Sequence, residues 1–313
     1  MAAPTKRRAH VRSDHDRVFG LRLDHPEFDA MAAWYDFDYE GRMRVDLPFW
    51  LRCAREGGGP VLELGAGTGR VSAFLAKAGF DVVGVELSSA MIARAEARRA
   101  RLRAVGHRLR FVEGDMSRLR VRGRFGTILV PFRAFNHLYT IERQLAALQG
   151  IRQRLAPGGL VVIDLWNPDL PDLAAKSERV QVSYERFDAR SGLRVVQRFR
   201  VRADLVEQMG YLDYWWDQYR GSRRVRRDHA PMRWRWFHRF EFEHLLARAG
   251  LAVERLYGDY RGTPLGPRSE DLIFVARRSS SRASGETARR RAARASVRPR
   301  SRAPGSRAAG SRR

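Results

Sequence analysis

The sequence predicts an α/β fold: a doubly wound, mostly parallel sheet with a small antiparallel β cap inserted after strand five. Three observations predict it. A short apolar run enters a glycine-rich turn at residues 61–70 (VLELGAGTGR), apolar strands then alternate with amphipathic helices up to residue 165, and the apolar period changes to two between about 178 and 237. We therefore expect one α/β unit that carries a β-rich insertion.

The composition is that of a globular protein. With 313 residues, 44% of them hydrophobic, the chain is long enough to bury a full core. No apolar run approaches the roughly 18 residues that a membrane span needs, and no apolar segment follows the basic start, so we expect a cytoplasmic protein without membrane contact. The single cysteine, Cys53, excludes an internal disulfide and any multi-cysteine metal site, and no metal is predicted.

The net charge of +25 is concentrated at the ends of the chain. Residues 277–313 hold thirteen arginines against one acid, and residues 1–17 add a net +3. Both segments lack apolar periodicity and are predicted to be disordered. Nearly all basic residues are arginine, which favours a compositional bias over a phosphate-binding surface. Nonspecific contact of the tail with nucleic acid stays open as an alternative.

The glycine turn predicts a ligand site. Glycines at alternate positions permit positive φ and let a ligand approach the backbone, and the helix that follows has an apolar face. A dinucleotide-binding pattern G-x-G-x-x-G that starts at Gly65 would need glycine at position 70, which is Arg70. The glycines of the turn are Gly65, Gly67 and Gly69.

The stretch Glu63 to Gly69, E-x-G-x-G-x-G, resembles motif I of the class I S-adenosylmethionine-dependent methyltransferases. The resemblance implies a seven-stranded sheet with an antiparallel C-terminal hairpin, S-adenosyl-L-methionine as cofactor and S-adenosyl-L-homocysteine as product. It implies that Gly65, Ala66 and Gly67 pack against the methionine moiety, while Glu63 supports the turn or contacts the amino group of the cofactor.

A second apolar strand, residues 81–87, ends at Glu86, about twenty residues beyond the glycines. At this distance a carboxylate can accept both hydroxyls of a ribose, although a surface glutamate at a strand end is the alternative. Ser88 or Ser89 can cap the next helix, whose Met91 is placed to pack beneath an adenine ring. Leu87 belongs to the same expected cofactor contacts.

The third strand, residues 109–112, is followed by Glu113, Gly114, Asp115 and Met116. The resemblance gives Asp115 the role of accepting a hydrogen bond from the adenine amine, with the backbone of Met116 at a ring nitrogen. Glu113 is the weaker candidate because it directly continues the strand.

The fourth strand, residues 126–130, leads into a loop that should lie beside the transferable methyl group, because the carboxyl ends of parallel strands face the ligand. Phe132 in this loop is expected to contact the cofactor. The N-P-P-Y-like motif of enzymes that methylate base amines is absent. His137 is a candidate general base, with a helix cap or core partner as the alternative, and Asn136 and Tyr139 are polar groups that can orient an acceptor.

An aromatic and acidic segment, residues 28–50, precedes the first strand. It could be a helical arm that packs on the domain. In methyltransferases that resemble this chain, a tyrosine near such a "YD" pair folds over the cofactor, so Tyr35 is a further candidate for the catalytic site. A helix is expected over 47–56.

The remaining elements follow from periodicity. A helix capped by Thr140 precedes the turn L-x-P-G-G and a fifth strand at 160–165, and the aromatic-rich insertion is expected to form about four strands. These aromatics could pack on the parent sheet or on a second subunit, and some should line an acceptor pocket. The expected regions are a lead-in (1–17), a cofactor-binding domain (18–177), an insertion (178–237), a closing helix and strands (238–276) and a tail (277–313).

The resemblance implies an enzyme that methylates a small-molecule acceptor, at nitrogen or oxygen, by in-line displacement. The alternative is an RNA-directed methyltransferase or a nucleic-acid-binding protein that uses the basic tail. The aromatic cap is also compatible with a homodimer.

Overall fold

The computed structural model describes residues 27–39, 45–176 and 178–279. The segments for which we predicted disorder, 1–17 and all but the first residues of 277–313, lie outside this described part of the chain. Within it, no helix is long and apolar enough to cross a membrane.

A seven-stranded sheet forms the centre of the fold, in the order β10-β11-β5-β4-β1-β2-β3. β11 runs opposite to the other six strands of this sheet, so the predicted mostly parallel sheet with an antiparallel C-terminal hairpin is confirmed. The strands are β1 (Val61–Leu64), β2 (Val82–Glu86), β3 (Leu109–Glu113), β4 (Phe125–Val130), β5 (Leu155–Trp166), β10 (Leu251–Tyr257) and β11 (Asp271–Arg278).

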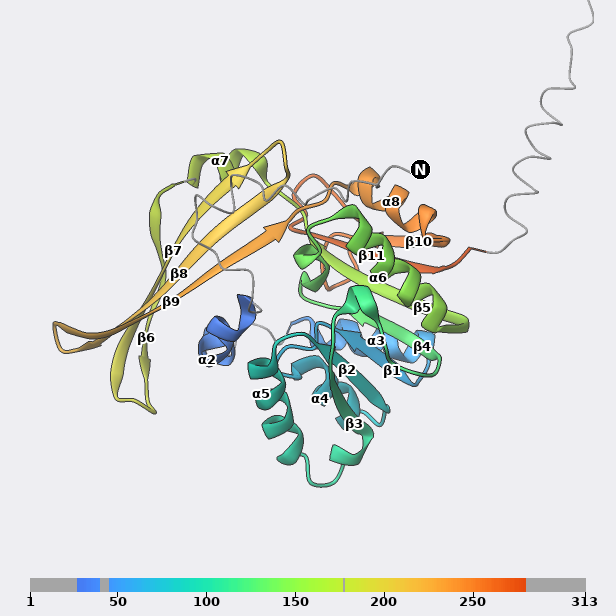
Figure 1. Ribbon diagram of the computed structural model, residues 1–313, viewed down its shortest axis with the longest axis horizontal. Coiled ribbons are helices and arrows are strands. Elements are labelled where there is room, and N and C mark those ends of the chain that lie inside the picture. The colour runs from blue at the N-terminus through green and yellow to red at the C-terminus, as the bar shows by residue number, and fades with distance from the viewer. Residues whose placement is uncertain (1–26, 40–44, 177, 280–313) are drawn as a thin grey trace, which may run out of the picture. The chain divides into compact units, whose positions relative to one another are not determined.

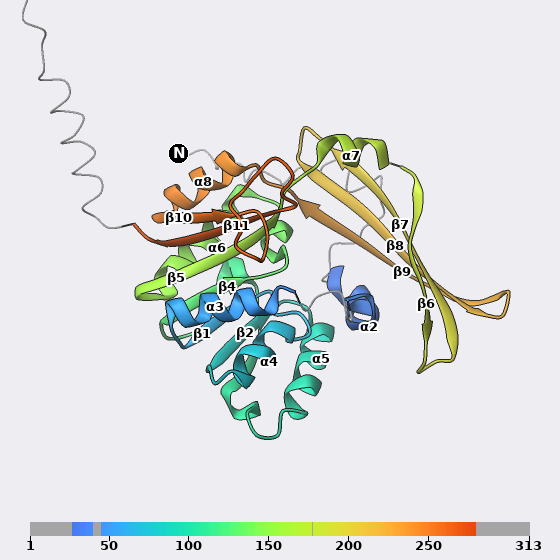
Figure 2. The ribbon, with the colours of Figure 1, turned by 180° about the vertical axis from the view of Figure 1, so that it is seen from behind.

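Helices cover both faces of this sheet, as Figures 1 and 2 show from opposite sides. One face carries α3 (Leu47–Gly57), α4 (Arg70–Lys77) and α5 (Ser89–Ala100), and the other carries α6 (Ile141–Arg154) and α8 (Arg239–Arg248). Four short elements were not predicted from the sequence: the helix α7 (Leu170–Lys176) and the 3₁₀ turns η1 (Gly106–Arg108), η2 (Met116–Arg118) and η3 (Ala134–His137).

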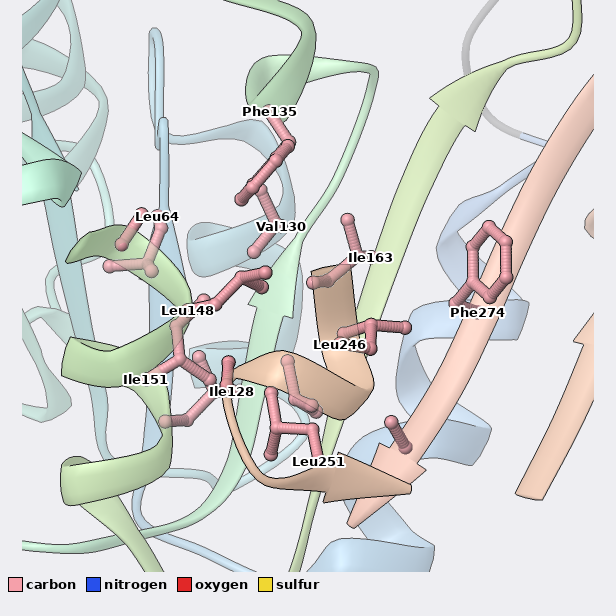
Figure 3. Close-up of a cluster of buried hydrophobic side chains, with 14 of the residues drawn as sticks. Leu64, Ile128, Val130, Phe135, Leu148, Ile151, Ile163, Leu246, Leu251 and Phe274 are labelled. Atoms are coloured by element: carbon pink, nitrogen blue, oxygen red, sulfur yellow. The ribbon is translucent and has the colours of Figure 1, made fainter. Parts of the chain in front are cut away.

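The core between the sheet and α6 and α8 explains why the strands are continuously apolar. Ile128 and Val130 of β4 contribute side chains that are fully buried, as are Leu148 of α6 and Leu246 of α8 (Figure 3). Because both faces of these strands are covered, the side chains on both faces are apolar, and apolar residues do not alternate with polar ones.

Two predicted helix caps are confirmed. The Ser88 hydroxyl accepts a hydrogen bond from the Met91 amide at 3.1 Å, and the Thr140 hydroxyl accepts one from the Arg143 amide at 3.3 Å. Strand β5, however, begins before the Pro-Gly-Gly break rather than after it. Leu155 already pairs with β4, and the register shifts before pairing resumes at Leu160, so the break is a bulge inside the strand.

The insertion forms a separate four-stranded antiparallel sheet, as predicted, in the order β6-β7-β8-β9. Its inner face packs against α2 (Glu27–Tyr39), which also contacts α5. The strands are β6 (Val180–Asp188), β7 (Leu193–Asp204), β8 (Met209–Arg220) and β9 (Arg223–Arg235). We call this sheet the cap.

Helix α2 joins the cap to the cofactor-binding half through its acidic residues. Towards the central fold, Asp36 accepts hydrogen bonds from the Thr68 hydroxyl at 2.7 Å and from Arg98 at 2.9 Å. Towards the cap, the Asp38 carboxylate, 4% exposed, accepts hydrogen bonds from Trp216 and Gln197, both at 2.9 Å, and from the Tyr184 hydroxyl. One helix is thus fixed to both halves.

The free edge of β9 is docked by side chains rather than by another strand. The Asn136 amide donates to the carbonyl oxygen of Arg235 at 2.6 Å, and the Arg233 amide donates to the Glu27 carboxylate at 3.0 Å. The Tyr139 hydroxyl donates to the same carboxylate at 2.7 Å. Polar side chains therefore satisfy backbone groups that an edge strand would otherwise leave open.

We expect Asp38→Ala to lower the free energy of unfolding by about 3–5 kcal/mol, because buried donors of the cap lose their acceptor. Urea denaturation followed by tryptophan fluorescence measures the change. Asp36→Ala is the matched control on the same helix, and because its ion pair is partly exposed it should cost less than about 1 kcal/mol. Equal losses in the two variants would contradict the role given to Asp38.

Candidate functional site

A cavity of about 310 Å³ lies at the carboxyl ends of the parallel strands. Its floor comes from the β1–α4 turn, from the end of β2 and from the loop after β4, and its roof from α2, β8 and β9. This volume lies within the range of small-molecule sites. The carboxyl edge is where open α/β sheets bind ligands.

The glycine turn brings bare backbone to the cavity. Gly65 and Gly67 both line it, with φ angles of 71° and 55°. A Cβ on Gly65 would lie 2.5 Å from the Cβ of Ala134, and a Cβ on Gly67 would touch the ring of Tyr35 at 3.9 Å. Side chains at these two positions would strain the turn and fill the space above it.

Glu86 stands at the end of β2 on the cavity wall, 8% exposed. Its carboxylate accepts hydrogen bonds from three backbone amides, those of Gly67 at 2.8 Å, Leu87 at 2.8 Å and Ser88 at 2.9 Å. Burial raises the pKa of Glu86, and the three N–H groups act in the opposite direction. The side chain is therefore held in one orientation, and Leu87 beside it also borders the cavity.

Glu63 and Ala66, two of the expected cofactor contacts, do not line the cavity. Glu63 is 2% exposed and hydrogen-bonds through its carboxylate with the Ser72 hydroxyl at the start of α4. Burial raises its pKa to about 7. Of the two roles expected for Glu63, this geometry fits support of the turn.

The expected adenine contacts also border the cavity: Asp115 and Met116 directly after β3, and Met91 on α5. Asp115 accepts hydrogen bonds from the amide and hydroxyl of Ser117, each at 2.8 Å, and from Arg143 at 2.9 Å. Burial alone would raise the pKa of Asp115, but the hydrogen bonds from Ser117 and the charge of Arg143 lower it. Asp115 is therefore ionised at neutral pH.

Both candidate catalytic residues reach the cavity. Tyr35 comes from α2 and lies over Gly67, close to Phe132, with 6.5 Å between the ring centroids. The helical-arm alternative is also realised, because α2 packs on the cap. His137 packs edge-on against Phe28 at 4.7 Å. Burial lowers the pKa of His137, so its imidazole is neutral at pH 7.

Residues 61–159 match the model of a family described as a methyltransferase domain. The solved structure of the CcbJ methyltransferase from Streptomyces caelestis has the same fold, with a TM-score of 0.71 at 23% identity over 82% of this chain and 99% of that one. Residues 61–159 thus form a methyltransferase domain, and the chain has the fold of the S-adenosylmethionine-dependent methyltransferases. The S-adenosylmethionine-bound amino pentose methyltransferase CalS10 from Micromonospora echinaspora also has this fold, with a TM-score of 0.60 at 24% identity over 78% of this chain and 96% of that one.

Two relatives match the methyltransferase over most of its length. The putative methyltransferase YqeM from Bacillus subtilis is 23% identical over 74% of this chain and 89% of its own. The dTDP-3-amino-3,4,6-trideoxy-alpha-D-glucopyranose N,N-dimethyltransferase from Streptomyces venezuelae is 29% identical over 75% of this chain and 95% of its own.

Some aromatic residues of the insertion line the cavity, as expected, and one further aromatic residue, Trp166, was not expected there. Of the aromatic residues of the insertion, Tyr214 and Trp234 line the methyltransferase cavity, whereas Trp216 and Trp236 are buried in packing clusters. Trp166 also lines it. Its position at the carboxyl end of β5 was the signal that could have identified it.

Arg133, in the loop after β4, is a second missed residue of the cavity. Its φ angle is 63°, and its guanidinium donates to the Asp271 carboxylate at 2.8 Å. Nothing in the local sequence signals this pairing, because Asp271 follows more than a hundred residues later.

We expect Glu63→Gln to remove a pH dependence of stability. The folded pKa of about 7 lies above the ordinary value of 4.5, so the native state binds more protons between these values and loses stability as pH rises through that window. The variant should therefore gain up to about 3 kcal/mol relative to the wild type on going from about pH 4.5 to about pH 8.

Urea titrations across this pH range measure the difference. Glu113→Gln, at an exposed position at the end of β3, is the matched control and should follow the wild type. Parallel stability curves for Glu63→Gln and the wild type would show that Glu63 is ionised throughout.

Proposed function

We propose that the methyltransferase methylates an amine nitrogen of a small-molecule acceptor. The observation that carries the proposal is a single cavity with two unlike ends. One end has bare glycine backbone and the carboxylates Glu86 and Asp115, and the other, under the cap, is mostly apolar and aromatic. The Streptomyces venezuelae relative, named as an N,N-dimethyltransferase of an amino sugar, supports nitrogen as the target.

The cofactor would occupy the first end. Gly65 and Gly67 face the methionine moiety, and Phe132 flanks it. Glu86 binds the ribose, and since a carboxylate has about four acceptor positions and three are taken by backbone amides, we infer that one hydroxyl binds directly. Met91 packs on the adenine, and Leu87 borders it. Asp115 accepts a hydrogen bond from the adenine amine, and the backbone of Met116 binds a ring nitrogen.

The cofactor, when bound, supplies an activated methyl group: a nitrogen–carbon bond forms as the sulfur–carbon bond breaks, and S-adenosylhomocysteine leaves. The protein's task is to hold the amine in line and without its proton. Apolar walls favour the neutral form of an amine. Neutral His137 on the same wall has a nitrogen that can take up the proton released by the product ammonium.

Closure of the site is the role we give to Tyr35. Its ring covers the glycine turn from the side of α2 and remains a neutral phenol, because burial raises its pKa well above the ordinary value. A ring in this position keeps water away from the transferred methyl group.

The carboxylates that line the cavity also favour an amine acceptor over a hydroxyl, because neither of them is placed to act as a general base. A hydroxyl of ordinary acidity must lose its proton to a positioned base before it attacks, whereas a neutral amine already has a free electron pair. The carboxylates on the described cavity wall, Glu86 and Asp115, are at the cofactor end and are held by other hydrogen bonds.

We expect S-adenosylhomocysteine to bind with micromolar affinity, and Glu86→Ala and Asp115→Ala each to weaken it at least about tenfold, roughly 1.4 kcal/mol. Isothermal titration calorimetry measures this directly. Glu113→Ala, exposed at the end of β3 and not part of the cavity, should bind like the wild type. Unchanged affinity in both cavity variants would refute the assigned cofactor position.

The choice of nitrogen is tested with matched acceptors. Transfer of a radiolabelled methyl group should be detected to amines such as benzylamine and not to the corresponding alcohols. Transfer to alcohols alone would contradict an amine acceptor.

A further inference from the structure

Three hydrogen-bond donors from separate elements line one part of the cavity: Tyr39 at the end of α2, Arg133 in the loop after β4 and Tyr214 on β8. Tyr39 packs on the ring of Phe132, which precedes Arg133 in the chain, with 5.1 Å between the ring centroids. The positive charge of Arg133 lowers the pKa of both tyrosines, and Tyr39 raises that of Tyr214. The three groups therefore interact electrostatically with one another.

Both phenols are donors at neutral pH. Burial is the main cause that raises the pKa of Tyr39 to about 12, and the nearby charge of Asp38 adds to it. Burial likewise raises the pKa of Tyr214 well above its ordinary value, more than Arg133 can offset. Neither hydroxyl ionises under physiological conditions, so each offers a proton to a ligand.

Neither hydroxyl has a hydrogen-bond partner among the described residues, although both rings are fixed by packing. Tyr39 packs edge-on against Tyr35 at 5.0 Å and against Phe132 at 5.1 Å, and Tyr214 packs on Trp216 at 5.7 Å. Half-buried hydroxyls with fixed rings and no protein partner are groups whose acceptor comes from a ligand or from water.

The guanidinium of Arg133 is oriented by an ion pair with Asp271. Asp271 accepts its hydrogen bond at 2.8 Å, and fully buried Asp164 lies next to this pair, where it accepts a hydrogen bond from the Tyr260 hydroxyl at 2.6 Å. With one donor engaged there, 38% of the Arg133 side chain remains accessible. The Nε atom of Arg133 is buried and has no hydrogen-bond partner among the described residues, so the guanidinium keeps donors that Asp271 does not use.

We propose that Tyr39, Arg133 and Tyr214 form a carboxylate-binding subsite, which we call the anion subsite. All three groups donate and none needs to accept, so the matching ligand group is an anion. A guanidinium prefers the paired oxygens of a carboxylate, and hydrogen bonds that involve charges are the stronger ones. Asp271 engages one donor of the guanidinium and leaves its other N–H groups for a ligand.

The carboxylate can come from two sources with the same chemistry: the methionine moiety of the cofactor, or an acidic acceptor molecule. The inference rests on the proposed function, because it takes the cavity as the site of both. Binding measurements separate the sources without knowledge of the natural acceptor.

The experiment compares calorimetric binding of S-adenosylhomocysteine with that of 5′-methylthioadenosine, which has the nucleoside and thioether but no amino acid moiety. The full-length variants are Tyr39→Phe, Tyr214→Phe and Arg133→Lys. Phenylalanine keeps each ring and removes only the hydroxyl, so the fold is retained even where a change at Arg133 would disturb it. Tyr219→Phe, on the same strand as Tyr214 but outside the cavity, is the matched control.

If the cofactor supplies the carboxylate, each cavity variant loses at least about fivefold in affinity for S-adenosylhomocysteine and keeps its affinity for 5′-methylthioadenosine. If the acceptor supplies it, S-adenosylhomocysteine binds unchanged. The protein saturated with it then binds 4-(aminomethyl)benzoate more tightly than benzylamine, and the cavity variants lose this preference.

Variants that change neither measurement would overturn the anion subsite and leave Arg133 as a residue that fixes its loop to β11. In that case, wild-type binding of both nucleosides would still uphold the cofactor site. A folded wild type that binds neither nucleoside would overturn the cofactor placement and the subsite together.

Discussion

The buried carboxylate of Asp38 is the interaction on which the geometry of the site depends. The helix that carries it also carries Tyr35 and Tyr39. Among the strands to which it bonds, β8 carries Tyr214 and pairs with β9, which carries Trp234. The roof of the cavity is therefore assembled from two parts of the chain, far apart in sequence, by one acid that several donors share. Such an acid is stable in the interior only while its donors are in place, which makes correct assembly of the roof an all-or-none event.

Sequence reasoning succeeded where structure follows from local rules. The parallel strands were evident as buried apolar runs, and the helix start at Ser88 followed from a side chain that bonds its own neighbouring backbone. Glu86 was expected at the site because the carboxyl ends of strands converge in this fold, and Asp115 because its position resembles that of an acid in the methyltransferases. Arg133 and Trp166 were missed because their surroundings come from β11 and the cap, which no local pattern specifies.

The site divides into a half that the family pattern specifies and a half that it does not. On the cofactor side, the constraint is backbone shape: two glycines with positive φ and an acid held by amides. On the acceptor side, the constraint is which side chains two separate elements present to the cavity. The first kind of constraint can be recognised in sequence. The second depends on the register of the cap strands, where a slip of one residue would turn Trp234 away from the cavity.

The docking of β9 by side chains has a consequence for how the enzyme can diversify. Asn136, Tyr139 and Glu27 hold this edge through its backbone, and the Arg233 side chain adds an ion pair with Glu27 at 2.7 Å. None of these contacts involves a cap side chain that lines the cavity. Cap residues that face the cavity can therefore vary without loss of attachment. A scaffold of this kind can acquire new acceptors by exchanging a few side chains on one sheet, while the methyl-donor half is inherited unchanged.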